Sequence, residues 1–156
     1  MKTLLVLVGK TTDKHFQAGI SDYVERISHY MPMEILTIPE LKNTKSLSEK
    51  QQKQLEGEQI LKLLQSQDTV VLLDEHGKEL RSIEFASWLE QKRNTVRRLV
   101  FVIGGPYGFS PDVYSRANEQ LSLSRMTFSH QLIRLVFTEQ LYRACTIIKK
   151  EPYHHE

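Results

Sequence analysis

Short apolar runs alternate with helical apolar stripes along the whole chain. Residues 3–8 form a continuous run that is too short for a helix, which predicts a strand buried on both faces. Four further strands are expected over residues 33–38, 69–73, 99–103 and 120–124. Between them, apolar residues recur at helical spacing and predict helices over 13–30, 47–66, 82–93, 111–117 and 130–149. This alternation predicts an α/β fold, a mostly parallel sheet with helices on both faces.

Local signals place several boundaries of these elements. Ser82 is expected to cap the third helix, and Ser110 followed by Pro111 should begin the short fourth one. The polar residues 74–78 are expected to form a turn after the third strand, and residues 40–47 a flexible loop. Inward-facing positions are predicted at Leu55, Ile60, Leu61 and Leu64 on the second helix, and at Ile83, Phe85, Ala86 and Leu89 on the third.

The last helix is apolar around much of its circumference. A helix of this kind is expected to be buried on more than one side, which predicts a subunit interface and a homodimer. The stripe comprises Ile133, Val136, Phe137, Leu141, Ala144 and Ile148, widened by Leu132, Leu135 and Tyr142.

Composition limits the class of protein. With 156 residues, 40% of them hydrophobic and 26% charged, the chain is expected to form one domain over residues 1–156. Cys145 is the single cysteine, which excludes an internal disulfide and a cysteine-rich metal site. Its apolar helix favours a small buried side chain over a nucleophile. No apolar run reaches transmembrane length and no signal-peptide core follows Met1, so we expect a cytoplasmic protein without membrane or metal.

A net charge of +2 does not by itself indicate a nucleic-acid-binding protein, so RNA contacts would have to come from local clusters. Each cluster is more simply an ordinary solvated surface than a phosphate-binding site, because such runs are common on soluble domains. Three stand out: Lys42 with Lys45; Lys92, Arg93, Arg97 and Arg98; and Lys149 with Lys150.

A glycine-rich segment follows the fourth predicted strand. Gly104, Gly105 and Gly108 leave bare backbone at a strand end, where α/β proteins bind small molecules. The spacing is not that of a dinucleotide fingerprint, and the lysine of a phosphate-binding loop is absent. An adenosine recognised through apolar and backbone contacts fits better, although a plain strand-to-helix turn remains an alternative.

Several segments together resemble a known family, the bacterial large-subunit rRNA pseudouridine methyltransferases of the SPOUT class. The resemblance extends over the whole chain, although this family usually has proline where this chain has Ser129. The segments are Leu72-Leu73-Asp74 with Gly77-Lys78, Val102 to Gly108, Leu121 to His130, Glu139 to Ala144, and Pro152-Tyr153-His154.

The resemblance implies an S-adenosylmethionine-dependent enzyme that methylates N3 of a pseudouridine in 23S rRNA. It further implies a homodimer whose carboxy-terminal third forms a trefoil knot, a topology that pattern reasoning would have argued against. Because the chain has no added RNA-binding domain, we expect it to act on assembled ribosomes. By motif match, the cofactor-binding residues would be Leu73, Gly104, Leu123, Ser124, Arg125, Met126, Thr127 and Phe128.

Methyl transfer to an imide nitrogen requires alignment and loss of one proton. A nearby cation would stabilise the developing anion, for which Arg125, Arg134 and Arg143 are candidates. His130 could relay the proton or simply cap a helix. The tail residues Tyr153 and His154 could stack on a base or belong to a frayed end.

Two other functions remain open from the sequence. The same sheet could serve a non-catalytic RNA- or nucleotide-binding module, or a SPOUT methyltransferase that acts on another RNA. Binding of S-adenosylhomocysteine would separate an enzyme from a simple RNA adaptor.

Overall fold

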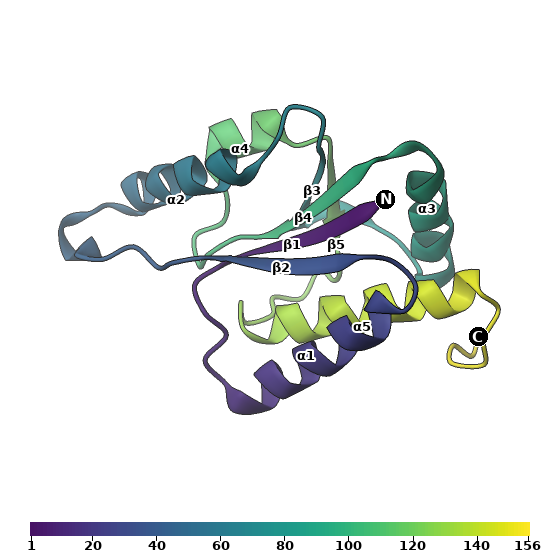
Figure 1. Ribbon diagram of the computed structural model, residues 1–156. Helices are drawn as coiled ribbons and strands as arrows, with labels where there is room; N and C mark the ends of the chain where they lie inside the picture. Colours follow the sequence, from purple (N-terminus) through teal and green to yellow (C-terminus); the bar gives the residue numbers. More distant parts are fainter.

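A computed structural model describes all residues, 1–156, as a five-stranded sheet covered by helices on both faces (Figure 1). Every pair of neighbouring strands is parallel, in the order β2-β1-β4-β3-β5. The predicted α/β class is therefore confirmed. The strands are β1 (Lys2–Val8), β2 (Met33–Ile38), β3 (Thr69–Glu79), β4 (Arg98–Ile103) and β5 (Glu119–Ser122). The helices are α1 (Lys14–Ser28), α2 (Glu49–Leu63), α3 (Ser82–Thr95), α4 (Pro111–Arg116) and α5 (Leu132–Ile148), with a 3-10 turn at Thr44–Ser46.

Each face of the sheet has its own apolar core. On one face, Leu5 and Phe101 pack with residues of α1, α3 and α5, including the fully buried Phe137. On the other face, Val6 and Val102 pack against α2 and α4. Because alternate residues of a strand point to opposite faces, a continuous apolar run is what a sheet covered on both sides requires.

Part of the wide apolar surface of α5 is covered within one chain. The helix lies on the sheet between α1 and α3, as Figure 1 shows, and Leu135 contacts Gly19 of α1. None of the large apolar side chains that remain exposed lies on α5. Burial of this helix on several sides is thus confirmed for Phe137, Leu141 and Ala144. Leu132, Leu135, Val136 and Tyr142 are only half-buried, so a subunit interface on α5 stays a prediction.

The predicted turn over residues 74–78 is wrong. The third strand continues through this segment to Glu79, because the backbone pairs with β5 again after a shift in register between Leu73 and Lys78. The irregularity lets polar residues extend a strand whose first half is a buried apolar run. It also carries the chain past the end of β4 and beside β5.

Several finer predictions can be compared with the structure. Ser110 accepts a hydrogen bond from the amide of Val113 and caps α4, as expected. The third helix is capped differently: Glu84 accepts from the backbone N–H of Arg81, while Ser82 is already helical. Leu55 and Ile83 are exposed rather than inward-facing.

Cys145 is buried among apolar side chains, and burial raises its thiol pKa to about 11. The expected role as a small buried side chain is confirmed, since a thiol with so high a pKa is a poor nucleophile at neutral pH. No helix of the structure has the length and apolar character needed to cross a membrane.

Candidate functional site

A cavity of about 360 Å³ opens where β4, β5 and the buried first half of β3 end, and we call it the strand-end cavity. The connection from β4 to β5 passes over β3, so the three strand ends lie side by side in the sheet. Three segments form most of the wall: residues 73–76, 103–109 and 122–128, of which only Arg125 is not in the lining. His130, Ile133 and Tyr114 complete it.

The structure brings nearly all of the predicted cofactor-binding residues to this one cavity. Those in the lining are Leu73, Gly104, Leu123, Ser124, Met126, Thr127 and Phe128. Arg125 lies outside it, with a side chain that is 89% exposed and an Nε 2.7 Å from Oε1 of Glu79. The role of these residues in binding stays a prediction, but their convergence from three separate segments is a finding.

The glycine turn, residues 104–108, packs against other side chains on one side and lines the strand-end cavity on the other. A Cβ on Gly104 would lie 3.0 Å from the ring of Phe109, and one on Gly105 would lie 2.7 Å from Oε1 of the buried Glu56. Gly108 has φ +81° and donates its N–H to the carbonyl of Gly105. The turn therefore needs glycine for its own packing and also presents backbone to the cavity.

Asp74 is the charged centre of this cavity, and sequence reasoning did not assign it a role. Its side chain is only 7% exposed and accepts hydrogen bonds from the N–H of His76, at 2.9 Å, and from the hydroxyl of Tyr114. Burial alone would raise the pKa of Asp74, but these hydrogen bonds outweigh it and hold the pKa below its usual value. Burial and the neighbouring carboxylate raise the pKa of Tyr114. At neutral pH the cavity therefore holds an anion beside a neutral phenol.

The position of Asp74 directly after the buried apolar run of β3 was the signal that could have identified it. Tyr114 gave no such signal, because α4 brings it to Asp74 from 40 positions further along the chain. A polar residue that follows an apolar strand of an α/β protein is generally close to the ligand-binding edge of the sheet.

We expect Asp74→Asn to reduce the dependence of stability on acid pH. The folded-state pKa of Asp74 is lowered, so its contribution is present above the unfolded pKa of about 3.9 and is lost as pH falls through the folded value. Urea unfolding should thus show a gap between wild type and variant at pH 7 that closes towards pH 2. A gap that is constant with pH would contradict the lowered pKa.

The predicted catalytic residues are not all at the cavity. His130 lines it, whereas Arg134 is fully buried and does not line it. The guanidinium of Arg134 donates to the carbonyls of Val8, at 2.8 Å, and Gly9, at 3.0 Å, and to the hydroxyl of Thr11. These hydrogen bonds connect α5 to the loop that follows β1. Burial lowers the pKa of the Arg134 guanidinium.

The remaining three candidates form a cluster at the far end of α5, which we call the tail cluster. Arg143 lies 2.6 Å from Oε1 of Glu139, and the hydroxyl of Tyr153 donates to the same oxygen at 3.1 Å. Nδ1 of His154 is 3.1 Å from Nη1 of Arg143, whose guanidinium also lies over the Tyr153 ring. Burial, followed by hydrogen bonding and the Glu139 charge, raises the pKa of Tyr153. The tail is thus docked on α5 rather than frayed.

The tail cluster and the strand-end cavity occupy different parts of α5. The cavity reaches this helix at Ile133, and Arg143 lies about 15 Å further along at a rise of about 1.5 Å per residue. Neither Tyr153 nor His154 lines the cavity of its own chain.

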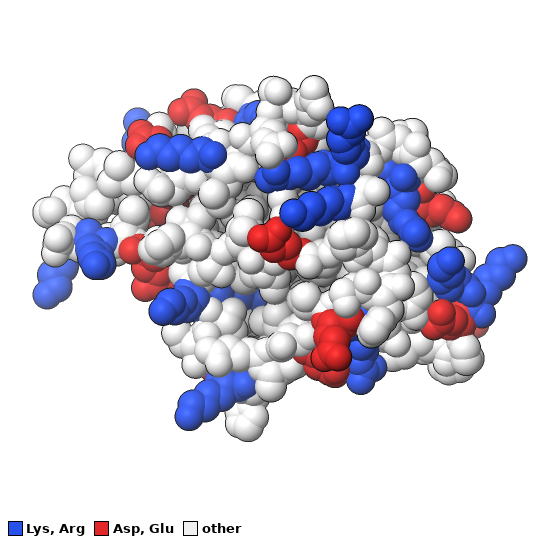
Figure 2. Space-filling model, viewed as in Figure 1, with Lys and Arg blue, Asp and Glu red and all other residues white.

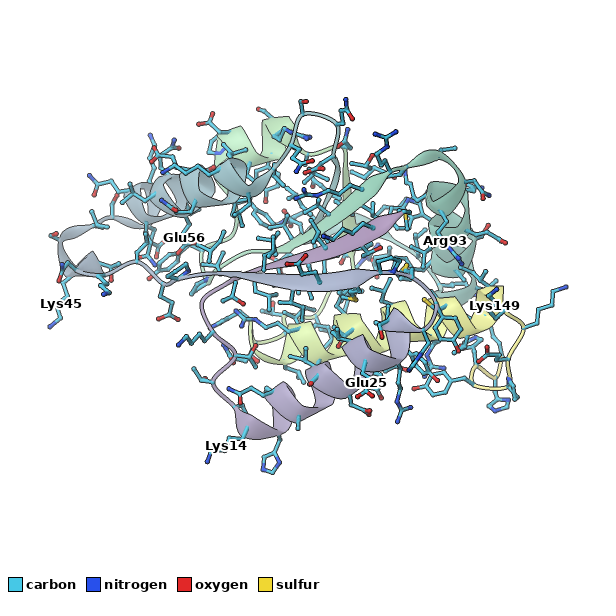
Figure 3. All side chains as sticks on the ribbon, viewed as in Figure 1. Lys14, Glu25, Lys45, Glu56, Arg93 and Lys149 are labelled. Carbon is cyan, nitrogen blue, oxygen red and sulfur yellow. The ribbon has the colours of Figure 1, made fainter.

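The basic clusters identified in the sequence are separated in space. Figure 3 places Lys45 and Lys149 at opposite ends of the molecule. Figure 2 shows acidic side chains interspersed among the basic ones on the face in view. Lys92 pairs with Glu119, and Arg98 with Asp68 at 3.3 Å. No group of three or more His, Cys, Asp or Glu side chains is placed to hold a metal ion.

Comparison with known proteins identifies the family to which the chain is similar. A family model described as "Predicted SPOUT methyltransferase" matches residues 1–154. The chain is 62% identical over 157 aligned residues to a Phocaeicola vulgatus protein named "Ribosomal RNA large subunit methyltransferase H", with 100% of both chains covered. It is 60% identical to a protein of the same name from Bacteroides fragilis, again over 100% of both chains. A third, from Christiangramia forsetii, is 56% identical over 99% of each chain.

Proposed function

This chain belongs to the SPOUT methyltransferase family, and from that premise we propose that it transfers a methyl group from S-adenosylmethionine to N3 of a pseudouridine in 23S rRNA. Activity as an rRNA methyltransferase rests on full-length identity of up to 62% with relatives named for that activity. The observation that carries the proposal is the convergence of the three predicted segments on one cavity that contains Asp74. We place the reaction in the cytoplasm, where ribosomes are, and family membership implies the carboxy-terminal trefoil knot.

The lining of the strand-end cavity suits S-adenosylmethionine in its apolar character and its charge. Leu73, Ile103 and Ile133 supply apolar wall for an adenine, and the glycine turn supplies backbone without Cβ atoms. The anionic Asp74 suits a ligand that carries sulfonium and ammonium cations, and no Lys or Arg side chain lines the cavity. Bound there, the cofactor would supply an electrophilic methyl carbon.

The protein's own groups would then align the acceptor nitrogen and manage its proton. His130 lies in the cavity lining and could accept that proton, directly or through water. A guanidinium such as that of Arg143 would stabilise the imide anion. Because Arg143 is distant from the cavity of its own chain, this group would have to come from elsewhere.

A homodimer would supply this guanidinium from the second subunit. If two α5 helices pair antiparallel about a two-fold axis, the Arg143 end of one lies beside the Ile133 end of the other. Exposed apolar side chains at the mouth of the cavity, Tyr107, Tyr114 and Met126, would gain cover from a partner or from RNA. We therefore propose that each cavity is completed by the partner's tail.

The function is tested by mass spectrometry of rRNA from a strain that lacks this protein, where one pseudouridine should lose a methyl group. Purified protein should transfer a tritiated methyl group to the same nucleotide, more readily in intact ribosomes than in naked rRNA. An unchanged methylation pattern would contradict the proposal, and equal activity on naked rRNA would contradict the preference for the assembled particle.

Neighbouring residues of one loop offer a matched test of the cofactor site. Thr127→Arg introduces a long cation into the cavity and should weaken S-adenosylhomocysteine binding by at least about tenfold, since it fills space and repels the ligand's ammonium. Arg125→Ala, on a side chain outside the lining, should change the affinity by less than about twofold. Calorimetry measures both, and equal effects would remove this loop from the site.

A further inference from the structure

A second cavity, of about 280 Å³, lies between the start of α3, the middle of α5 and the edge strand β5, and we call it the basic cavity. It shares Leu73, Ser122 and Leu123 with the strand-end cavity, so the two are separated by a single layer of side chains. Phe85 and Val136 contribute to its apolar wall. Figure 1 labels α3 and α5, the two helices that contribute to its wall.

The two cavities have opposite charge. The strand-end cavity is lined by Asp74 and Glu75 and by no Lys or Arg side chain. The basic cavity is lined by Lys78 and Arg81 and by no Asp or Glu side chain. The first therefore suits a cationic ligand and the second an anionic one.

The chain itself already places an anion at the rim of the basic cavity. The carboxylate of Glu156 lies 2.5 Å from Nη2 of Arg81. The side chains are 68% and 35% exposed, and ion pairs this exposed contribute little to stability. A phosphate could therefore replace the carboxylate, because a guanidinium binds both groups with the same geometry.

Polar groups inside the basic cavity are held in fixed positions. The hydroxyl of Ser82 donates to Oε1 of Gln140 at 2.9 Å, and Nε2 of Gln140 donates to Glu139 at 3.0 Å. The side-chain amide of Gln140 has remaining capacity to donate and accept, as recognition of a base edge requires. Glu139 also holds Arg143 and Tyr153, so the basic cavity adjoins the tail cluster.

We propose that the basic cavity binds one nucleotide of the RNA substrate, next to the one that is methylated. Its phosphate lies at Lys78 and Arg81, its base lies along Phe85 and Val136, and Gln140 contacts the base edge. Apolar contact for a base combined with cations for its phosphate is the usual way in which proteins hold single-stranded RNA. The proposal rests on the proposed function for the identity of the RNA, but the binding site itself does not.

The binding site can be tested without catalysis. Uridine 5′-monophosphate, titrated into full-length protein loaded with S-adenosylhomocysteine, should shift the side-chain amide resonance of Gln140 in NMR spectra. Lys78→Ala with Arg81→Ala should weaken this binding by at least about tenfold, and uridine without phosphate should bind comparably weakly to the wild type. Lys50→Ala with Lys62→Ala, on the opposite face of the sheet, is the matched control and should have no effect.

Steady-state methylation gives the second measurement. The double variant at Lys78 and Arg81 should raise KM for the RNA substrate about tenfold, with kcat and S-adenosylhomocysteine affinity unchanged. Because the two cations hold one phosphate, their loss should lower the slope of log K against log salt by about 0.7. The control pair should leave KM and slope at wild-type values.

Three results would overturn the proposal: no shift at Gln140, an unchanged KM in the double variant, or a double variant that is monomeric where the wild type is dimeric. The last would identify the basic cavity as a subunit interface. Failure of the proposed function would look different, because S-adenosylhomocysteine would then not bind to the wild type while uridine 5′-monophosphate would still shift Gln140.

Discussion

Removal of residues 151–156 is expected to lower methyl transfer by about a thousand-fold and to leave the affinity for S-adenosylhomocysteine unchanged. The deletion takes away Tyr153 and His154 and leaves Arg143 without the two tail side chains that position its guanidinium. It removes nothing from the strand-end cavity. Single-turnover methylation and calorimetry on the same preparation measure the two effects separately.

A shorter deletion provides the control. Removal of His155 and Glu156 breaks the exposed pair between Arg81 and Glu156 but leaves the tail cluster intact. This variant should retain nearly full activity. Comparable losses in the two deletions would show that the end of the chain matters and that Tyr153 and His154 do not.

A mixed dimer decides whether the tail acts on its own cavity or on the partner's. We expect co-refolding of Thr127→Arg with the tail-deleted form to restore about a quarter of wild-type activity, since half of the dimers are mixed and each has one complete site. With S-adenosylmethionine held well below the wild-type dissociation constant, the tail-deleted form alone should be nearly inactive and Thr127→Arg alone should keep about a tenth of wild-type activity or less. If the mixture is no more active than the two forms alone, the tail serves its own cavity.

The parts of the fold that the sequence predicted are those governed by local pattern. The buried runs of β1 and β4 and the cap at Ser110 depend on residues next to one another, and the structure confirms them. The extension of β3 beyond Leu73 depends on pairing with β5, a strand about 40 residues away, so its polar composition was misleading. Tertiary contacts often override local preference in this way.

The candidate site likewise combines features that local sequence predicts with features that only tertiary contacts determine. Strand ends and glycine turns carry local signals, and residues 123, 124 and 126–128 do line the cavity that they were predicted to form. Side-chain direction within an irregular loop has no such signal, which is why Arg125 was grouped with its neighbours although it points outward. Asp74 and Tyr114 meet only because the fold brings α4 close to the middle of β3.

Arg134 shows why a charged residue in a sequence can be mistaken for a catalytic one. An arginine on an apolar helix suggests chemistry, because a buried cation is costly unless its hydrogen bonds are satisfied. Here the carbonyls of Val8 and Gly9 accept from the two terminal nitrogens, while the buried Nε has no partner. Both carbonyls are main-chain atoms that a sequence pattern does not reveal. The structure therefore supports a structural role, and a catalytic role is a separate hypothesis that stability measurements can test.

Arg134→Met is expected to lower the free energy of unfolding by about 3 kcal/mol, because it leaves two buried carbonyls without a charged donor. Arg134→Lys should lose less, since an ammonium can reach only some of these acceptors. Arg125→Met, which removes an exposed pair with Glu79, is the control and should cost less than about 1 kcal/mol. Urea unfolding measures all three, and the folded Arg134→Lys enzyme should keep kcat within about threefold of wild type. Normal stability combined with a large loss of kcat would instead place the Arg134 guanidinium in the reaction.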